Sequence, residues 1–176
     1  MQFRFTEPAE DFSDGVAVLR SYHDCMLRQG EALLQLAMAI RDGGITKDLA
    51  NQAVAMHTFY TRANWLHHRD EEQCLFPALL DNSPLMDGMI ERLALDHEEI
   101  EQAWEQLAPF LATPEAIDDR QGLWERARSF EKLQREHLTR ENEDFLPEVS
   151  TQLSDRQRTQ IGQRMAEIRG LDCERA

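Results

Sequence analysis

Residues 67–77 of the chain read HHRDEEQCLFP, and residues 137–147 read HLTRENEDFLP. Each stretch holds a histidine, a glutamate four residues later, and a proline six residues after the glutamate. The two pairs are His67 with Glu71 and His137 with Glu141, and the same interval along the chain separates the histidines, the glutamates and the prolines. Because the residue types, their order and their spacing all recur, the pattern indicates a repeated structural unit.

One further histidine precedes each of these stretches. The two are His23 and His97, separated by a similar interval, and each lies in a long segment with apolar residues at helical spacing. Each half of the chain therefore has a histidine on one helix and a His-x-x-x-Glu pair on the next. Packed together, two such hairpins bring four imidazoles and two carboxylates to the axis of a helical bundle.

The hydrophobic pattern and the turn residues predict an all-α fold. We expect long helices over about 13–42, 47–80, 83–112 and 117–147, and a shorter one over 154–170. The pair Gly43–Gly44 ends the first helix, and Thr46 and Ser83 cap the second and third. Pro77 and Pro109 lie near helix ends, where a kink or stop is expected. Long amphipathic helices joined by short loops favour an antiparallel four-helix bundle, here with a short C-terminal fifth helix.

The length of 176 residues is that of one domain. We expect this domain over residues 13–170, between an N-terminal arm (1–12) and a tail (171–176). The formal net charge of −14 disfavours nucleic acid and membrane surfaces as partners. No apolar run approaches the ~20 residues of a membrane span, and the first residues do not read as a secretory signal. Three cysteines at unrelated spacings favour reduced thiols, so we expect a soluble, cytoplasmic protein.

The His-x-x-x-Glu spacing has a chemical meaning. Residues four apart share one face of a helix, so His67 and Glu71 can bind the same ion or adjacent ions. A carboxylate can bridge two metals, whereas an imidazole gives one nitrogen to one metal. Burial of so many polar groups costs roughly several kcal/mol unless they are paired or metal-bound. Mixed imidazole and carboxylate donors suit iron, and less exclusively manganese or zinc.

With these motifs, and with DHEEIE at residues 96–101, the chain resembles the hemerythrin family in its HHE cation-binding branch, over about residues 13–170. The resemblance implies a four-helix bundle around a non-haem di-iron centre, two iron ions with an oxo or hydroxo bridge. It implies terminal nitrogen ligands at His23, His67, His97 and His137, and bridging carboxylates at Glu71 and Glu141.

One position departs from the oxygen-carrying members of that family. They have a fifth histidine one turn after the third-helix ligand, and here the residue four after His97 is Glu101. A glutamate there can bind the metal as an additional oxygen ligand, contact a metal-binding side chain without binding the metal itself, or face solvent. The departure disfavours reversible oxygen carriage.

Neighbouring polar residues compete for roles in the centre. His68 aligns with Leu138 in the repeat and points about 100° away from His67, so we expect it at the periphery, with a position beside a metal ligand as the alternative. Glu72 aligns with Asn142, which leaves Glu71 as the better bridge. Tyr60 and Asn64 either line a polar path to the metals or have a structural role, and the sequence favours neither. For His57 we favour a structural role.

From the resemblance we expect a protein that binds or reacts with a small ligand (dioxygen, nitric oxide or peroxide) in sensing or stress response. Iron storage, delivery or repair, and a peroxidase- or catalase-like enzyme, are the alternatives. No side-chain pattern indicates a general acid or a nucleophile. An exposed helical face is compatible with a homodimer or with an unidentified protein partner.

Overall fold

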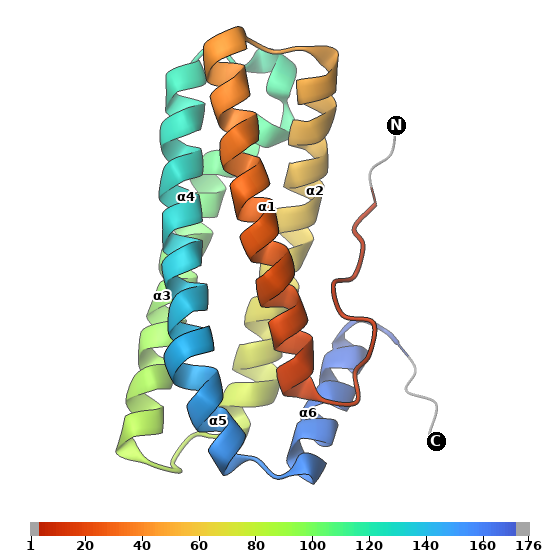
Figure 1. Cartoon of the computed structure of the whole chain (residues 1–176), viewed down its shortest axis with the longest axis vertical. Helices are drawn as coiled ribbons and strands as arrows, with labels where there is room; N and C mark the ends of the chain where they lie inside the picture. The colour runs from red at the N-terminus through yellow and green to blue at the C-terminus, as the bar shows by residue number, and fades with distance from the viewer. Residues whose placement is uncertain (1–3, 172–176) are drawn as a thin grey trace.

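The structure is a computed structural model that describes residues 4–171, and four long helices dominate it (Figure 1). These are α1 (Gly15–Gly43), α2 (Lys47–Asp70), α3 (Pro84–Ala112) and α4 (Arg120–Arg140). Helices α1 and α3 each pack against both α2 and α4, so α2 and α4 lie diagonally across the bundle. The predicted all-α, antiparallel four-helix bundle is confirmed.

The helix starts follow the capping residues in the sequence. Thr46 Oγ1 accepts a hydrogen bond from the backbone of Leu49, and Ser83 Oγ accepts one from Met86, as predicted. Helix α1 begins at Gly15, two residues later than expected, because the carboxylate of Asp14 caps it. It ends at Gly43 and is followed by Gly44, whose φ of 81° is one that a glycine adopts without strain.

Helices α2 and α4 are each followed by one π-helical turn, where the sequence predicted continuous helix. The turns are Glu71–Leu75 and Glu141–Phe145, and each begins at the glutamate of a His-x-x-x-Glu pair. In the first turn the amide of Phe76 donates to the carbonyl of Glu71, five residues back. Phe76 directly precedes Pro77, which has no N–H and cannot continue the hydrogen-bond ladder. The repeat seen in the sequence is therefore a repeat of backbone geometry as well.

Two further boundaries differ from expectation. Helix α4 begins at Arg120 rather than near residue 117, because a 3₁₀ turn, Pro114–Ala116, precedes it and Asp119 caps it. After the second π turn the chain stays helical in α5 (Leu146–Gln152), beyond the predicted end at 147, since a proline is tolerated in a first turn. Helix α3 ends at Ala112 as predicted, with Pro109 in its last turn. The short helix α6 (Asp155–Ile168) begins with the expected capping box of Ser154 and Gln157.

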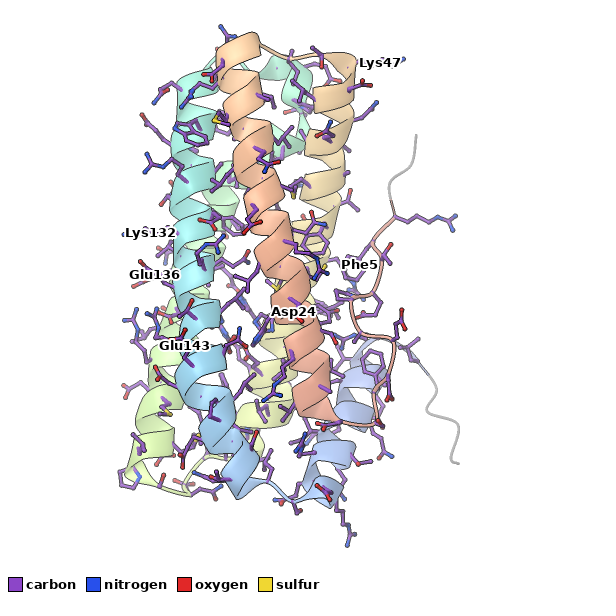
Figure 2. The ribbon with its side chains drawn as sticks, in the orientation of Figure 1. Phe5, Asp24, Lys47, Lys132, Glu136 and Glu143 are labelled. Carbon is purple, nitrogen blue, oxygen red and sulfur yellow. The ribbon has the colours of Figure 1, made fainter. Side chains whose placement is uncertain are left out.

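Two apolar clusters lie on either side of a buried polar layer. Along α3, Met86 and Leu93 belong to one cluster, Ile100 and Leu107 belong to the other, and His97 lies between them. Most other charged side chains lie on the outside of the bundle. Lys132 and Glu136, for example, project outward from α4 (Figure 2), with Nζ and Oε1 3.7 Å apart. The bundle thus surrounds its polar layer with apolar packing.

The N-terminal segment and α6 pack beside one end of the bundle (Figure 1). Arg169, just after α6, donates to both carboxylate oxygens of Asp70 at 2.8 and 2.7 Å and to Glu7 at 2.9 Å. Its guanidinium lies over the rings of Phe12 and Tyr22, 5.0 and 5.2 Å from their centroids. Burial raises the pKa of Asp70 to about 6, against the opposing effect of the guanidinium. One buried cation therefore ties three segments together beside the first π turn.

None of the helices within residues 4–171 is both long enough and apolar enough to span a lipid bilayer. The predicted tail, with Cys173, falls almost entirely outside the described residues.

The substitution Arg169→Ala is expected to lower the free energy of unfolding by about 3 kcal/mol or more, because it leaves Asp70 buried without a cation. Urea denaturation followed by circular dichroism measures the change. The matched control is Arg156→Ala on the exposed face of α6, expected to stay within about 0.5 kcal/mol of the parent. Equal effects of the two substitutions would contradict this role of Arg169.

Candidate metal centre

The six ligands predicted from the sequence come together in the polar layer of the bundle. None of the six is more than 2% exposed, and they are His23, His67, Glu71, His97, His137 and Glu141. Helix α1 contributes His23, α2 contributes His67, α3 contributes His97 and α4 contributes His137. The two glutamates are the first residues of the two π turns. Every long helix of the bundle therefore supplies one imidazole of the set.

The carboxylate of Glu141 lies among three of these imidazoles. Its Oε2 is 3.0 Å from His23 Nε2, 3.4 Å from His67 Nε2 and 3.4 Å from His137 Nε2. These rings belong to three different helices, so one carboxylate contacts donors from most of the bundle.

The carboxylate of Glu71 has the corresponding place on the other side of the layer. Its Oε2 is 3.0 Å from His97 Nε2 and 3.7 Å from His67 Nε2. Both glutamates thus lie between imidazoles of different helices, which is the position that a bridging carboxylate occupies.

The two buried carboxylates have opposite protonation tendencies. Burial and the neighbouring charge of Glu141 raise the pKa of Glu71 well above its usual range. Burial acts on Glu141 too, but His137 and His23 hold the pKa of Glu141 well below its usual range. Burial lowers the pKa of His67 well below its ordinary value, so this imidazole is neutral at neutral pH and its nitrogen is free to bind a metal. Cations in the layer would let both carboxylates ionise.

Many buried polar atoms of the layer have no hydrogen-bond partner among the described residues, because the close contacts of Glu141 with the imidazoles lack hydrogen-bond geometry. They include Nε2 of His23, His67, His68 and His137, Oε1 of Glu71, and both carboxylate oxygens of Glu141. Buried polar atoms are normally paired, and each unpaired one costs about 1–3 kcal/mol. Candidate ligand atoms of His23, His67, Glu71 and Glu141 also lie within 4.8 Å of one another. Imidazole nitrogens and carboxylate oxygens gathered in this way fit iron, manganese or zinc.

Two outer residues orient the imidazoles. The ring N–H at Nδ1 of His23 donates to Oδ1 of Asn142 at 2.7 Å, and that of His97 donates to Oε1 of Glu72 at 2.7 Å. Each acceptor directly follows a bridging candidate, so the two acceptors occupy equivalent positions of the repeat. Such contacts fix the ring so that Nε2 faces the metal. The sequence predicted Glu72 only as a weaker bridge, although the repeat itself pairs it with Asn142.

The expected peripheral position of His68 is wrong. His68 is 3% exposed, and its ring stacks on that of His97 with centroids 4.0 Å apart and planes 12° apart. Candidate ligand atoms of His68, His97 and His137 lie within 4.8 Å of one another. The turn of about 100° from His67 moves the side chain toward α3 rather than toward solvent, since α2 borders both α1 and α3. Burial lowers the pKa of His68 to about 4, which keeps the ring neutral at neutral pH.

The remaining polar candidates take structural positions. Glu101, whose side chain is 62% exposed, accepts a hydrogen bond at 3.1 Å from Nδ1 of His68 and thus contacts the layer from outside. Asn64 accepts one from Gln134 at 3.0 Å inside the bundle. Tyr60 donates to the carbonyl of Met26 at 3.4 Å. His57 is half-buried, and its ring lies 5.8 Å from that of Trp104.

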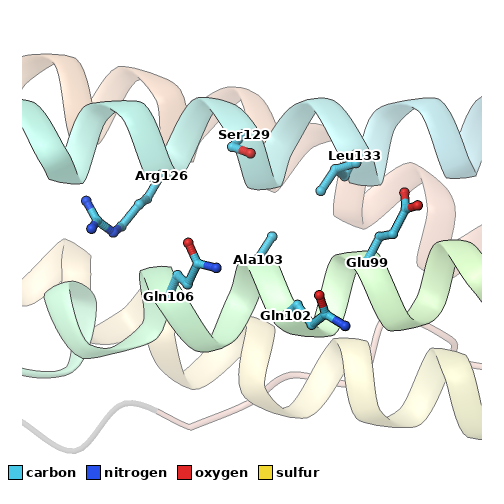
Figure 3. A pocket seen from close by; sticks show the side chains of 7 residues that line it. All are labelled: Glu99, Gln102, Ala103, Gln106, Arg126, Ser129 and Leu133. Atoms are coloured by element: carbon cyan, nitrogen blue, oxygen red, sulfur yellow. The ribbon is translucent and has the colours of Figure 1, made fainter.

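A surface groove between α3 and α4 is separate from this layer (Figure 3). It has a volume of about 260 Å³. None of the six predicted ligands lines the groove. Its lining residues are Glu99, Gln102, Ala103, Gln106, Arg126, Ser129 and Leu133. The candidate centre is therefore an interior site and does not open into this groove.

Comparison with known proteins agrees with this geometry. The family model of the hemerythrin HHE cation binding domain matches residues 14–149, a range that includes all six predicted ligands. An uncharacterized protein of Haemophilus influenzae is 26% identical over 108 residues, which is 61% of this chain. The chain spans 63% of that relative's length. The family predicted from the two histidine motifs is thus confirmed, and the chain belongs to the hemerythrin family as a protein with an HHE cation-binding domain.

Proposed function

We propose that the chain holds two iron ions in its buried polar layer and that they bind or react with dioxygen, nitric oxide or peroxide in sensing or stress response. One observation carries this proposal: imidazole nitrogens and carboxylate oxygens converge at one interior point. Many of these atoms have no hydrogen-bond partner among the described residues. Manganese or zinc would fit the same donors, and the family favours a cation without specifying iron.

In this proposal His23, His67, His97 and His137 are terminal ligands, and Glu71 and Glu141 are bridges. Asn142 and Glu72 hold the rings of His23 and His97 through their outer nitrogens. Iron held by these residues would supply electrons and open coordination positions for a small ligand. The protein residues fix the donors, exclude bulk water and restrict access.

The burial of the donors supports a small ligand rather than a bulky substrate. The six side chains are at most 2% exposed and have apolar clusters on both sides. Four imidazoles and two bidentate carboxylates give eight donor atoms, whereas two octahedral ions take twelve. By this count four positions would remain for water and a small ligand. The same seclusion disfavours iron delivery, because a delivered ion has to leave the protein readily.

The first test is the metal content and the near-ultraviolet and visible spectrum of protein purified from iron-rich culture. We expect two iron ions per chain and charge-transfer bands that change when nitric oxide or peroxide is added. Faster consumption of peroxide or nitric oxide than by metal-stripped protein would identify an enzyme, and binding without turnover would favour a sensor. A metal content near zero, or iron-loaded protein without such bands, would refute the iron pair.

Removal of the metal with a chelator is expected to lower the melting temperature by about 5–10 °C, because ions that bind only the folded chain stabilise it. Differential scanning calorimetry before and after chelation measures the shift, and re-addition of ferrous iron should restore it. An unchanged melting temperature would mean that the buried donors are satisfied without metal.

The substitutions His67→Ala and His137→Ala should each lower metal affinity by at least about tenfold, since each removes one imidazole from the layer. Chelator competition with ferrous iron or zinc under argon measures the affinity. His57→Ala is the matched control, because His57 is a half-buried histidine beside Trp104 and outside the polar layer. Equal loss in all three variants would show that the ligands have been assigned wrongly.

A further inference from the structure

We propose that His68 is a fifth imidazole ligand of the centre, bound to the same ion as His97 and His137. This inference rests on the proposed metal-binding function and adds a ligand that the repeat in the sequence does not indicate. In the repeat, the residue that corresponds to His68 is Leu138.

The first observation is that one nitrogen of His68 is satisfied and the other is not. Nδ1 lies 3.1 Å from Oε1 of Glu101, and Nε2 is buried without a hydrogen-bond partner among the described residues. Since a carboxylate oxygen only accepts, Nδ1 carries the proton and Nε2 keeps its lone pair. A histidine that served only in packing would leave this lone pair buried at a cost in free energy.

The second observation is that His68 is held in the same way as two of the predicted ligands. His23 and His97 also donate from Nδ1 to an oxygen of a residue on another helical segment. For His68 that acceptor is Glu101 on α3, so the outer contact fixes the ring and the tautomer, as outer contacts do for metal-bound imidazoles.

The third observation is that three imidazoles lie close together. Candidate ligand atoms of His68, His97 and His137 are within 4.8 Å of one another, close enough to share one ion. The other group within the same limit contains His23, His67, Glu71 and Glu141. The donors therefore divide into two groups, and His68 belongs to the group of His97 and His137.

Glu101 has a clear role in this arrangement. It occupies the position four residues after His97 on α3, yet its side chain is 62% exposed and contacts His68 rather than the interior. The third imidazole of this ion then comes from α2, and Glu101 is the positioning residue that holds it.

The test uses Co(II) as a spectroscopic probe in the full-length apoprotein of the parent and of His68→Ala. Titration against a competing chelator gives the affinity of each of the two sites, and the visible d–d bands report the ligand field. We expect His68→Ala to weaken one site at least about tenfold, to leave the other within about twofold, and to alter the bands of the weakened site. Added imidazole should restore those bands, because it can occupy the space left by the side chain.

Two further variants support the interpretation. His57→Ala should bind two Co(II) ions like the parent, and Glu101→Gln, which keeps an acceptor oxygen, should weaken the same site less than His68→Ala does. If His68→Ala does not fold by circular dichroism, His68→Gln is titrated in the same way, with the same expected loss at one site.

Unchanged affinities and bands in a folded His68 variant, with clear losses in His67→Ala and His137→Ala, would overturn the inference and leave the proposed function intact. Equal loss at both sites without rescue by imidazole would also overturn it, since that is the result of general destabilisation. A parent protein that binds no Co(II) would refute the proposed function as well.

Discussion

The confinement of two carboxylates in the bundle interior, Glu71 and Glu141, is the constraint on which the rest of the structure depends. Neither is exposed, and the effect of burial on the ionisation of Glu141 is opposed chiefly by the surrounding imidazoles. A solvated pair of such groups would impose little on the fold. A secluded pair requires that donors from four helices be held close together, and two apolar clusters on either side provide this support.

The π turns connect this requirement to the backbone. Each begins at one of the two glutamates and closes at the residue before a leucine-proline or phenylalanine-proline step. Such turns occur frequently at functional sites, because they redirect side chains within an otherwise regular helix. Beside the first turn, Arg169 binds Asp70, the residue immediately before Glu71. The segment after α6 thus supports the part of α2 that carries the centre.

Much of this arrangement could be predicted from the sequence, because it follows local rules and a repeat. The caps at Thr46 and Ser83 depend only on adjacent residues, and the spacing of His67 and Glu71 recurs at His137 and Glu141. The burial of His68 could not be predicted in this way, since it depends on which helices lie beside α2. The π turns were missed for a related reason: a proline near a helix end marks an interruption without specifying its geometry.

The outer contacts of His23 and His97 make the two halves of the bundle chemically unequal. One ring donates to the neutral amide of Asn142, and the other donates to the carboxylate of Glu72, whose pKa is lowered by that hydrogen bond. A ring whose N–H donates to an anion is polarised more strongly than one whose N–H donates to a neutral amide. The repeated backbone therefore surrounds its two halves with different charges: an anionic acceptor lies behind His97, and a neutral one lies behind His23.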